Sequence, residues 1–415
     1  MIPLTRRTAL TGAAALAATP ALAAPRAVRA FVGTFTYAAG DRYPTDFGTV
    51  TGSRGIYSFL FDSRAGRISE LGLAAEVRHP GNLIAHPGGR FLYACQGQDF
   101  RIDGQNAITA FRVEGARLVA LNTVPCGGGG PTHGVVDSSG RNLLTTNFAT
   151  SSVVCFRLNA DGSIGERTAF IGKPPQPRPA AAAAAAGAPP AARRENPNAR
   201  APGERSKDPS QTKPHTIILT RSERYAIVAE IDSDRCSVYR FDAGAGSLTP
   251  HSVAASEPGS GPRHLAFEPS HRFLYSSDEA GSSITAWAWN EAKGEMRALQ
   301  RLSTIPADFD KTLSHPADVV VHPSGRFVYV SNRGHPSLAG FRIDPATGTL
   351  TPLPLTPLPV KASWCLVFDP TGRWALVTLQ PGGAVVVYKV DLDSGALTLT
   401  DQSAAVAMPT CITLI

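Results

Sequence analysis

Residues 262–294 read PRHLAFEPSHRFLYSSDEAGSSITAWAWNEAKG and contain one copy of the unit that decides the fold. A short apolar stretch that opens with Pro262 is followed by a turn ending in Arg272 and by a second apolar stretch. A third stretch alternates around Trp287 and runs into a polar turn closed by Gly294. Alternation with β-branched and aromatic residues is typical of strands, and no amphipathic helix of useful length intervenes. The segment therefore predicts consecutive strands joined by tight turns.

The same unit recurs along the chain. The turn, its Arg and the following apolar strand occur six times, with the Arg at positions 90, 141, 224, 272, 326 and 373. The intervals are 47 to 54 residues, except for one of 83 that contains the 41-residue stretch 172–212. The aromatic residue of the alternating strand occurs seven times, at Phe59, Phe111, Phe156, Tyr239, Trp287, Phe341 and Tyr388. A period near 50 residues, with several strands in each copy, is typical of propeller blades.

The two ends of the chain complete each other. The first copy begins directly with the equivalent of a second strand, RAFVGTF at 29–35, and the C-terminus ends in PTCITL at 409–414, a first strand without a blade. We therefore expect an all-β fold over residues 28–415: a seven-bladed β-propeller with four antiparallel strands per blade, closed when the C-terminal strand joins the N-terminal blade. The 39 Gly, 34 Pro and 18% charged residues agree with many turns and exclude long helical bundles.

The N-terminus predicts a removable export signal over residues 1–23. Arg6 and Arg7 precede an apolar run that is too short to span a bilayer, and Ala21-Leu22-Ala23 forms a cleavage site. The paired arginines resemble a twin-arginine signal, although Ala9 stands where a bulky apolar residue is preferred. We therefore expect the twin-arginine export machinery as a partner, a periplasmic or secreted protein, and no stable membrane anchor.

The net charge of +7 is concentrated outside the predicted blades. The leader holds two Arg and no acid, and residues 172–212 hold seven basic and three acidic residues, which leaves about +1 for the rest. The 172–212 stretch is rich in Pro and Ala and predicts a disordered insertion between blades. Without a basic patch interleaved with aromatic residues, a nucleic-acid partner is not expected.

Six scattered cysteines form no Cys-x-x-Cys pair and no zinc-type cluster with His. Four of them lie inside predicted strands, which favours buried thiols over disulfides, even in an exported protein.

Polar residues gather where the predicted strands meet one mouth of the channel. In an antiparallel blade, first strands start and second strands end on the same face. The first-strand starts carry Asn82, His133, His215, Arg263, His264 and Asp318. The second-strand ends carry Gln96, Asn147, Glu230, Asp278, Glu279, Asn332, Arg333 and Gln380. Any one of these residues has a structural alternative as a turn cap. The loops 37–55 and 97–106 and the 172–212 insertion fall on this face too, and predict a walled or lidded cleft.

The phrases GPRHLAFEPSHRFLYSSDEAGSSITAW, HPADVVVHPSGRFVYVSNRGHPSLAGFRIDPATGTL and FVGTFT resemble the seven-bladed lactonase family, which includes propeller 6-phosphogluconolactonases and carboxymuconate-lactonising enzymes. The resemblance implies chemistry on a lactone or its sugar acid, with no cofactor and no metal. It implies catalytic roles for His215, Arg263, Glu279 and Arg333. It implies substrate-binding roles for His133, Asn147, Glu230, His264, Asp318, His335 and Gln380. Thr216 and Trp364 depart from the family pattern, in the substrate pocket more than in the fold.

Lactone hydrolysis needs a base that activates water and a donor for the carbonyl oxyanion. Glu279 or His215 is expected as base and acid, and Arg263 and Arg333 as oxyanion or carboxylate binders. No Gly-x-Ser-x-Gly elbow supports a covalent serine route. Export favours an unphosphorylated aldonolactone, whereas an unused leader would favour 6-phosphogluconolactone.

Three alternatives stay open. A metal-dependent lactonase would use oxygen ligands from Glu230, Asp278, Glu279 and Asp318. A non-enzymatic binding propeller is possible because the fold hosts many functions. The third is a carboxymuconate-type cyclase.

Overall fold

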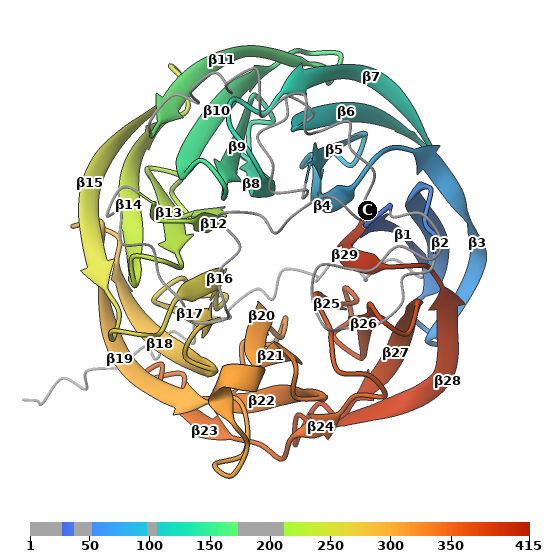
Figure 1. Ribbon diagram of the computed structural model, residues 1–415, viewed down its shortest axis with the longest axis vertical. Helices are drawn as coiled ribbons and strands as arrows, with labels where there is room; N and C mark the ends of the chain where they lie inside the picture. Colours follow the sequence, from blue (N-terminus) through green and yellow to red (C-terminus); the bar gives the residue numbers. More distant parts are fainter. Residues whose placement is uncertain (1–26, 37–51, 98–105, 173–210) are drawn as a thin grey trace, which may run out of the picture.

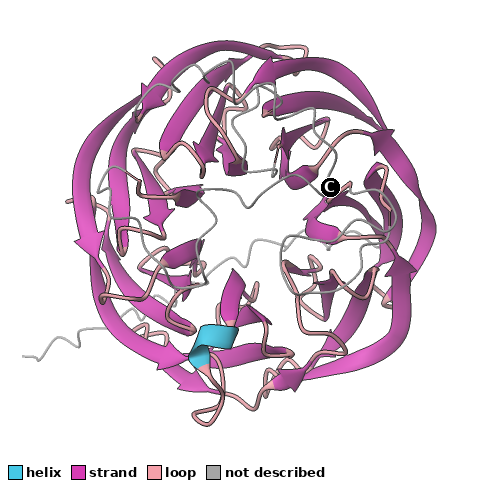
Figure 2. Ribbon diagram, viewed as in Figure 1, coloured by secondary structure: helices cyan, strands magenta, loops and turns pink. Residues whose placement is uncertain are grey.

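The computed structural model describes residues 27–36, 52–97, 106–172 and 211–415. Their strands form seven sheets arranged as blades around a common axis (Figures 1 and 2), which confirms the predicted all-β propeller. The helical element within the described ranges is the short 3-10 helix η3 (Lys311–Leu313). The predicted signal at 1–23, almost all of the 172–212 insertion and most of the two long loops lie outside the described residues.

The blades are numbered from the sheet that holds β1, and their strands are given from the channel outward. Blade 1 contains β29 (Pro409–Leu414), β1 (Ala27–Thr34), β2 (Gly55–Asp62) and β3 (Arg67–Glu76). Blade 2 contains β4 (Pro80–Ala85), β5 (Phe91–Gln96), β6 (Ala107–Glu114) and β7 (Arg117–Pro125). Blade 3 contains β8 (Pro131–Val136), β9 (Asn142–Asn147), β10 (Ser152–Leu158) and β11 (Ile164–Ile171). Blade 4 contains β12 (Pro214–Leu219), β13 (Tyr225–Glu230), β14 (Arg235–Asp242) and β15 (Ser247–Ala255). Blade 5 contains β16 (Pro262–Phe267), β17 (Phe273–Asp278), β18 (Ser283–Asn290) and β19 (Glu295–Ser303). Blade 6 contains β20 (His315–Val321), β21 (Phe327–Arg333), β22 (Ser337–Ile343), β23 (Leu350–Pro352) and β24 (Thr356–Pro357). Blade 7 contains β25 (Leu366–Phe368), β26 (Trp374–Leu379), β27 (Ala384–Val390) and β28 (Leu397–Ala405). The outer edge of blade 6 is split, because β23 and β24 each pair with β22.

The C-terminal strand closes the ring as predicted. β29 pairs antiparallel with β1, with Val32 opposite Ile412 and Gly33 opposite Cys411. A Cβ at Gly33 would lie 2.2 Å from the Pro80 carbonyl oxygen and 2.6 Å from the Cys411 Sγ, so glycine allows this close approach. The C-terminus lies beside β1 (Figure 1).

The repeated residues of the sequence tie each blade to the next. Within the blades, the seven aromatic residues of the alternating strands are all buried, from Trp287 at 0% to Tyr239 at 7% exposure. Between blades, the Arg272 Nη2 donates to the Pro345 carbonyl oxygen at 2.6 Å, and the Tyr275 hydroxyl donates to the Gly348 carbonyl oxygen at 3.1 Å. Gly348 has a φ of 74°, which suits a glycine in that turn. The sequence repeat therefore encodes contacts between blades as well as strands.

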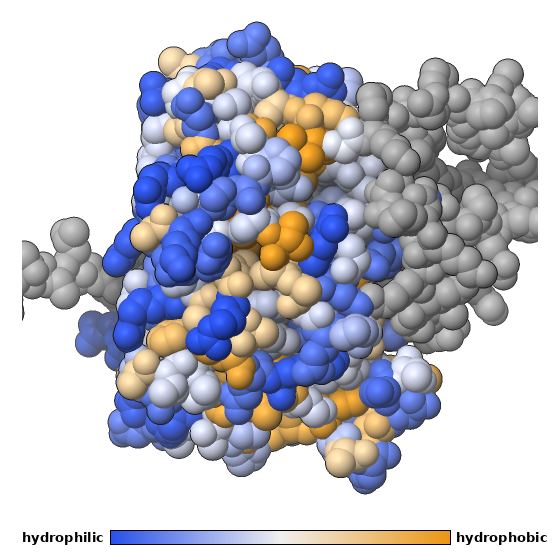
Figure 3. Space-filling view, turned by 90° about the vertical axis from the view of Figure 1, so that its left-hand side faces the viewer, coloured by the Kyte–Doolittle hydropathy of each residue, from blue (hydrophilic) through white to orange (hydrophobic). Residues whose placement is uncertain are grey.

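The outer wall carries hydrophilic residues with hydrophobic ones between them, on the side that Figure 3 shows. No helix among the described residues is long and apolar enough to cross a membrane. All six cysteines belong to the described residues, and each is buried and free, as the sequence predicts.

A chain that ends at Met408 tests the closure. Loss of β29 removes the strand that pairs with β1 and exposes the core around Val32. We expect the melting temperature to fall by about 10 °C or more. A synthetic peptide of residues 409–415, added in trans, should restore part of the loss. A truncated chain that melts at the wild-type temperature would contradict closure by β29.

Candidate active site

The central channel contains a cavity of about 420 Å³ lined by the first strands of all seven blades. Polar side chains lie where these strands begin, and apolar ones such as Val321 and Phe368 lie where they end. The polar lining residues are Asn82, Thr132, His133, His215, Arg263, His264, Asp318 and Thr410. The cavity therefore has one polar end, at the mouth that the sequence predicts.

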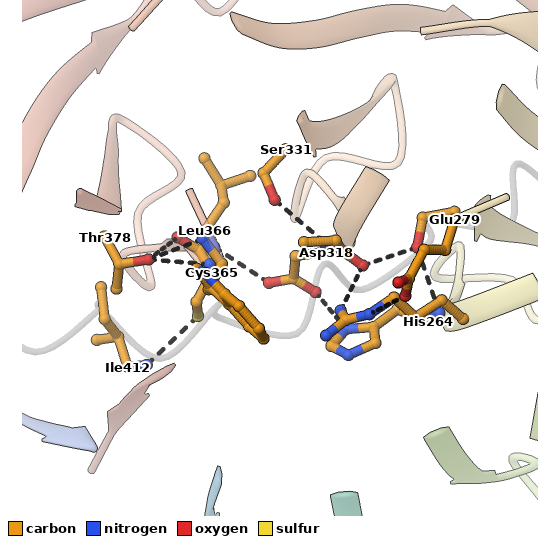
Figure 4. Close-up of polar contacts among 12 residues, drawn as sticks. His264, Glu279, Asp318, Ser331, Cys365, Leu366, Thr378 and Ile412 are labelled. Atoms are coloured by element: carbon orange, nitrogen blue, oxygen red, sulfur yellow. Dashed lines mark hydrogen bonds and ion pairs between the residues drawn. The ribbon is translucent and has the colours of Figure 1, made fainter. Parts of the chain in front are cut away.

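Three histidines from three neighbouring blades meet at the polar end. The ring centre of His264 lies 5.0 Å from that of His215 and 5.7 Å from that of His133. The Nδ1 of His264 lies 2.8 Å from the Oδ1 of Asp318 (Figure 4). Arg263 precedes His264 on β16, and its Nη1 donates to the Ala317 carbonyl oxygen at 2.9 Å. The cavity thus combines one cation with several groups that can accept or donate protons.

Glu279 holds two arginines beside this cavity. Its Oε2 lies 2.9 Å from the Arg263 Nε, and its Oε1 lies 3.1 Å from the Arg333 Nη2. Both guanidinium groups also face the indole of Trp364, with their carbons 5.6 and 4.6 Å from a ring centre. Trp364 packs edge-on against Phe35 at 5.6 Å. One carboxylate and one aromatic ring therefore fix two cations that would otherwise repel each other.

These contacts control the charge states of the cluster. Burial alone would raise the pKa of Glu279, but Arg333 and Arg263 outweigh it and lower that pKa to about 2. Burial, and then the charge of Arg333, lower the pKa of Arg263 to about 10. Glu279 is therefore an anion and Arg263 a cation at neutral pH.

The histidines are held neutral. Burial, followed by the neighbouring His264, lowers the pKa of His133 to about 3. Burial, followed by the charge of Arg263, holds the pKa of His215 well below 6.5. The same two causes lower the pKa of His264, while Asp318 opposes that shift. At neutral pH all three imidazoles are therefore uncharged.

The structure brings all four predicted catalytic residues together. His215 and Arg263 line the cavity, and Glu279 and Arg333 adjoin it through the ion pair with Arg263. Of the predicted substrate-binding residues, His133, His264 and Asp318 line the cavity.

The other four predicted substrate-binding residues do not line this cavity. The Asn147 Nδ2 donates to the Ser152 Oγ at 3.2 Å, and the Glu230 carboxylate accepts from Arg235 and two serines, so both tie the second to the third strand of their own blade. Gln380 is buried at 1% exposure. The ring of His335 packs edge-on against Phe309 at 4.8 Å. Asn147 and Glu230 therefore have structural contacts at the ends of their second strands.

Sequence reasoning missed Phe35 and His315, and it named Trp364 only as a departure from the family pattern in the substrate pocket. His315 begins β20, and its carbonyl oxygen accepts a hydrogen bond from the Arg333 Nε at 3.1 Å. Trp364 lies just before the first strand β25, close to the strand starts where the polar mouth residues lie, so its position was a signal even though its residue type was not. Phe35 follows a second strand, and nothing in its residue type distinguishes it from a core aromatic.

The carboxylates of the metal-dependent alternative are dispersed. Asp278 accepts hydrogen bonds from Ser276, Ser283 and Thr285 within its blade, whereas Asp318 faces His264. The described residues contain no group of three or more His, Cys, Asp or Glu side chains that could hold a metal ion.

The fold and site define a seven-bladed propeller with an arginine- and histidine-lined central cavity. The family model described as "Lactonase, 7-bladed beta-propeller" matches residues 30–414, so the chain belongs to the seven-bladed β-propeller lactonase family. This confirms the resemblance found in the sequence.

Named relatives agree with the family. The chain is 30% identical over 376 residues to a 6-phosphogluconolactonase of Bacillus subtilis, which covers 88% of this chain and 96% of the relative. It is 24% identical to a 6-phosphogluconolactonase of Formosa agariphila, over 91% of this chain and 96% of that protein. The solved structure of a periplasmic gluconolactonase from Pseudomonas aeruginosa is similar in fold, with a TM-score of 0.76 at 23% identity, over 94% of this chain and 99% of that one.

The ion pairs of Glu279 predict a pH-dependent stability. Because the pKa of Glu279 is lowered from 4.5 to about 2, its contribution is fully present above about pH 4.5 and is lost as the pH falls towards 2. We expect Glu279→Gln to lower the melting temperature at pH 6 and to approach the wild-type value as the pH falls. Melting curves from pH 6 to 3 measure this difference.

Glu257→Gln is the matched control, since Glu257 pairs with Arg301 but is 68% exposed and should change little. A Glu279→Gln difference that stays constant over this pH range would contradict the charge assignment.

Proposed function

We propose that this protein hydrolyses a sugar lactone in the mouth of the channel, in the manner of a 6-phosphogluconolactonase and without a metal ion. The observation that carries the proposal is the cation Arg263 in the cavity wall beside three neutral imidazoles. Hydrolysis of a lactone develops negative charge on the carbonyl oxygen and needs proton transfer at two oxygens. Relatives named 6-phosphogluconolactonase support this reaction class.

The arginines have the chemistry to bind the reacting carbonyl and the carboxylate product. A guanidinium presents planar donors that match a carboxylate, and a buried one is poorly screened by water. Arg263 is 3% exposed and Arg333 is 7% exposed. We propose that Arg263 stabilises the oxyanion and that Arg333, through Glu279 and Trp364, keeps the Arg263 guanidinium in place.

Glu279 and His215 differ as proton-transfer groups. Both oxygens of Glu279 are engaged in ion pairs and its pKa is about 2, which makes it a weak base. His215 lines the cavity and is neutral. We propose that Glu279 serves mainly to hold the two arginines and that a neutral imidazole of the cavity wall takes part in proton transfer.

The proposed substrate and location depend on the predicted leader. We propose export by the twin-arginine machinery to the periplasm or beyond, where an unphosphorylated aldonolactone is the expected substrate. The similar fold of a periplasmic gluconolactonase agrees with this proposal.

Stopped assays on a panel of aldonolactones, with and without a 6-phosphate, test the function. We expect Arg263→Ala to lower kcat/KM by about 100-fold or more, because it removes the oxyanion donor. Arg301→Ala is the matched control, since Arg301 pairs with Glu257 outside the cavity and should retain activity.

EDTA should leave the rate unchanged if no metal takes part. A wild-type protein that hydrolyses no lactone of the panel would contradict the proposal and favour a binding propeller. Loss of activity in EDTA, with recovery on adding a divalent cation, would favour the metal-dependent alternative.

A further inference from the structure

We infer that His264 is the catalytic base that takes the proton of the hydrolytic water. Asp318 is the positioning residue that orients the His264 ring and selects its tautomer. The inference deepens the proposed function and rests on it. It assigns the proton acceptor to a histidine–carboxylate pair in the cavity wall instead of to Glu279 or His215.

Asp318 is anchored from three directions. Its Oδ1 faces the His264 Nδ1 at 2.8 Å, and its Oδ2 accepts the backbone N–H of Leu366 at 3.1 Å. Its own backbone N–H donates to the Ser331 Oγ at 3.0 Å (Figure 4). Because Leu366 belongs to the neighbouring blade, the carboxylate bridges β20 and β25. Its orientation towards His264 is therefore set by the packing of two blades.

This contact selects the tautomer of His264. A neutral imidazole beside an ionised carboxylate carries its proton on the nitrogen that faces the carboxylate, here Nδ1. The other nitrogen, Nε2, then holds the lone pair that accepts a proton. The backbone N–H of His264 donates to the Ser277 Oγ at 3.2 Å, which fixes the strand beneath the ring.

The two other candidate bases lack such an orienting partner. Glu279 uses both oxygens in ion pairs with Arg263 and Arg333. The His215 Nδ1 is buried and has no hydrogen-bond partner among the described residues, so its tautomer is not set by a carboxylate. His264 alone among these three combines a place in the cavity wall with a carboxylate that orients it.

The charges around His264 keep it in its basic form. It is faced by Arg263 on its own strand, Asp318 on β20, His133 on β8, His215 on β12 and Arg333 on β21. Burial, and then Arg263, lower its pKa below 6.5, while Asp318 opposes that shift. Asp318 thus keeps the imidazole from becoming too weak a base.

The proposed step balances as follows. The water oxygen bonds to the lactone carbonyl carbon while His264 Nε2 takes one water proton, and the carbonyl electron pair moves to the oxygen beside Arg263. The tetrahedral intermediate then collapses, the bond from the carbonyl carbon to the ring oxygen breaks, and the imidazolium returns the proton to that oxygen. The product is the open hydroxy acid, and no oxidant or reductant is needed.

Asp318→Asn tests the pair with little change in packing. The Asn oxygen can still accept from Leu366, while its NH2 donates to His264 Nδ1 and moves the imidazole proton to Nε2. We expect kcat to fall by about 100-fold or more with a much smaller change in KM. We also expect the acid limb of the kcat/KM pH profile to move to lower pH, because the carboxylate that raised the His264 pKa is gone.

Asp369→Asn is the matched control, since Asp369 is a buried aspartate that, like Asp318, accepts a backbone N–H, here that of Trp374, but lies outside the cavity. It should keep kcat and the pH profile. A second variant, His264→Ala, should recover activity when imidazole is added, whereas the wild-type rate should not rise.

The outcomes separate the two proposals. Wild-type hydrolysis that persists in Asp318→Asn with an unmoved acid limb, or a folded His264→Ala that keeps its rate or gains nothing from imidazole, overturns the inference and leaves the function standing. A wild-type protein without lactone hydrolysis overturns both.

Discussion

The pairing of β29 with β1 is the constraint on which the rest of the molecule depends. Without it, blade 1 lacks its inner strand and β1 presents an unpaired edge to the channel. With it, the inner strands of all seven blades surround one axis and contribute to one cavity. Contacts between neighbouring blades, such as those of Arg272 and Tyr275, then hold the blades together.

Closure also accounts for the position of the site. Antiparallel pairing brings the starts of the first strands and the ends of the second strands to the same mouth. Arg263 and His264 open β16, Asp318 lies near the start of β20, and Glu279 follows β17. Four side chains from three separate stretches of sequence therefore meet at strand ends, and their charges influence one another. This arrangement places a cation and neutral imidazoles side by side in the cavity wall.

The sequence predicted the fold almost completely, because blade repeats carry their signal in periodicity and in the exchanged ends at 29–35 and 409–414. It also predicted the mouth and the cluster of Arg263, Glu279 and Arg333. The sequence did not distinguish residues at the cavity from residues that link strands within a blade, because Glu230 and Glu279 have the same residue type at nearly the same strand position. Glu230 accepts hydrogen bonds within its blade, whereas Glu279 reaches two arginines. The pairing of His264 with Asp318 was also beyond the sequence, since it depends on the angle between two blades.

The central claim is that the polar end of the channel, at Arg263, receives the carbonyl of a lactone and the carboxylate of its product. A crystal structure of the protein soaked with the corresponding open hydroxy acid tests it most directly. The account predicts the acid inside the channel, with its carboxylate within hydrogen-bond distance of the Arg263 guanidinium and beside His264. An acid bound only outside the channel, with the arginine cluster undisturbed at saturating concentration, would contradict it.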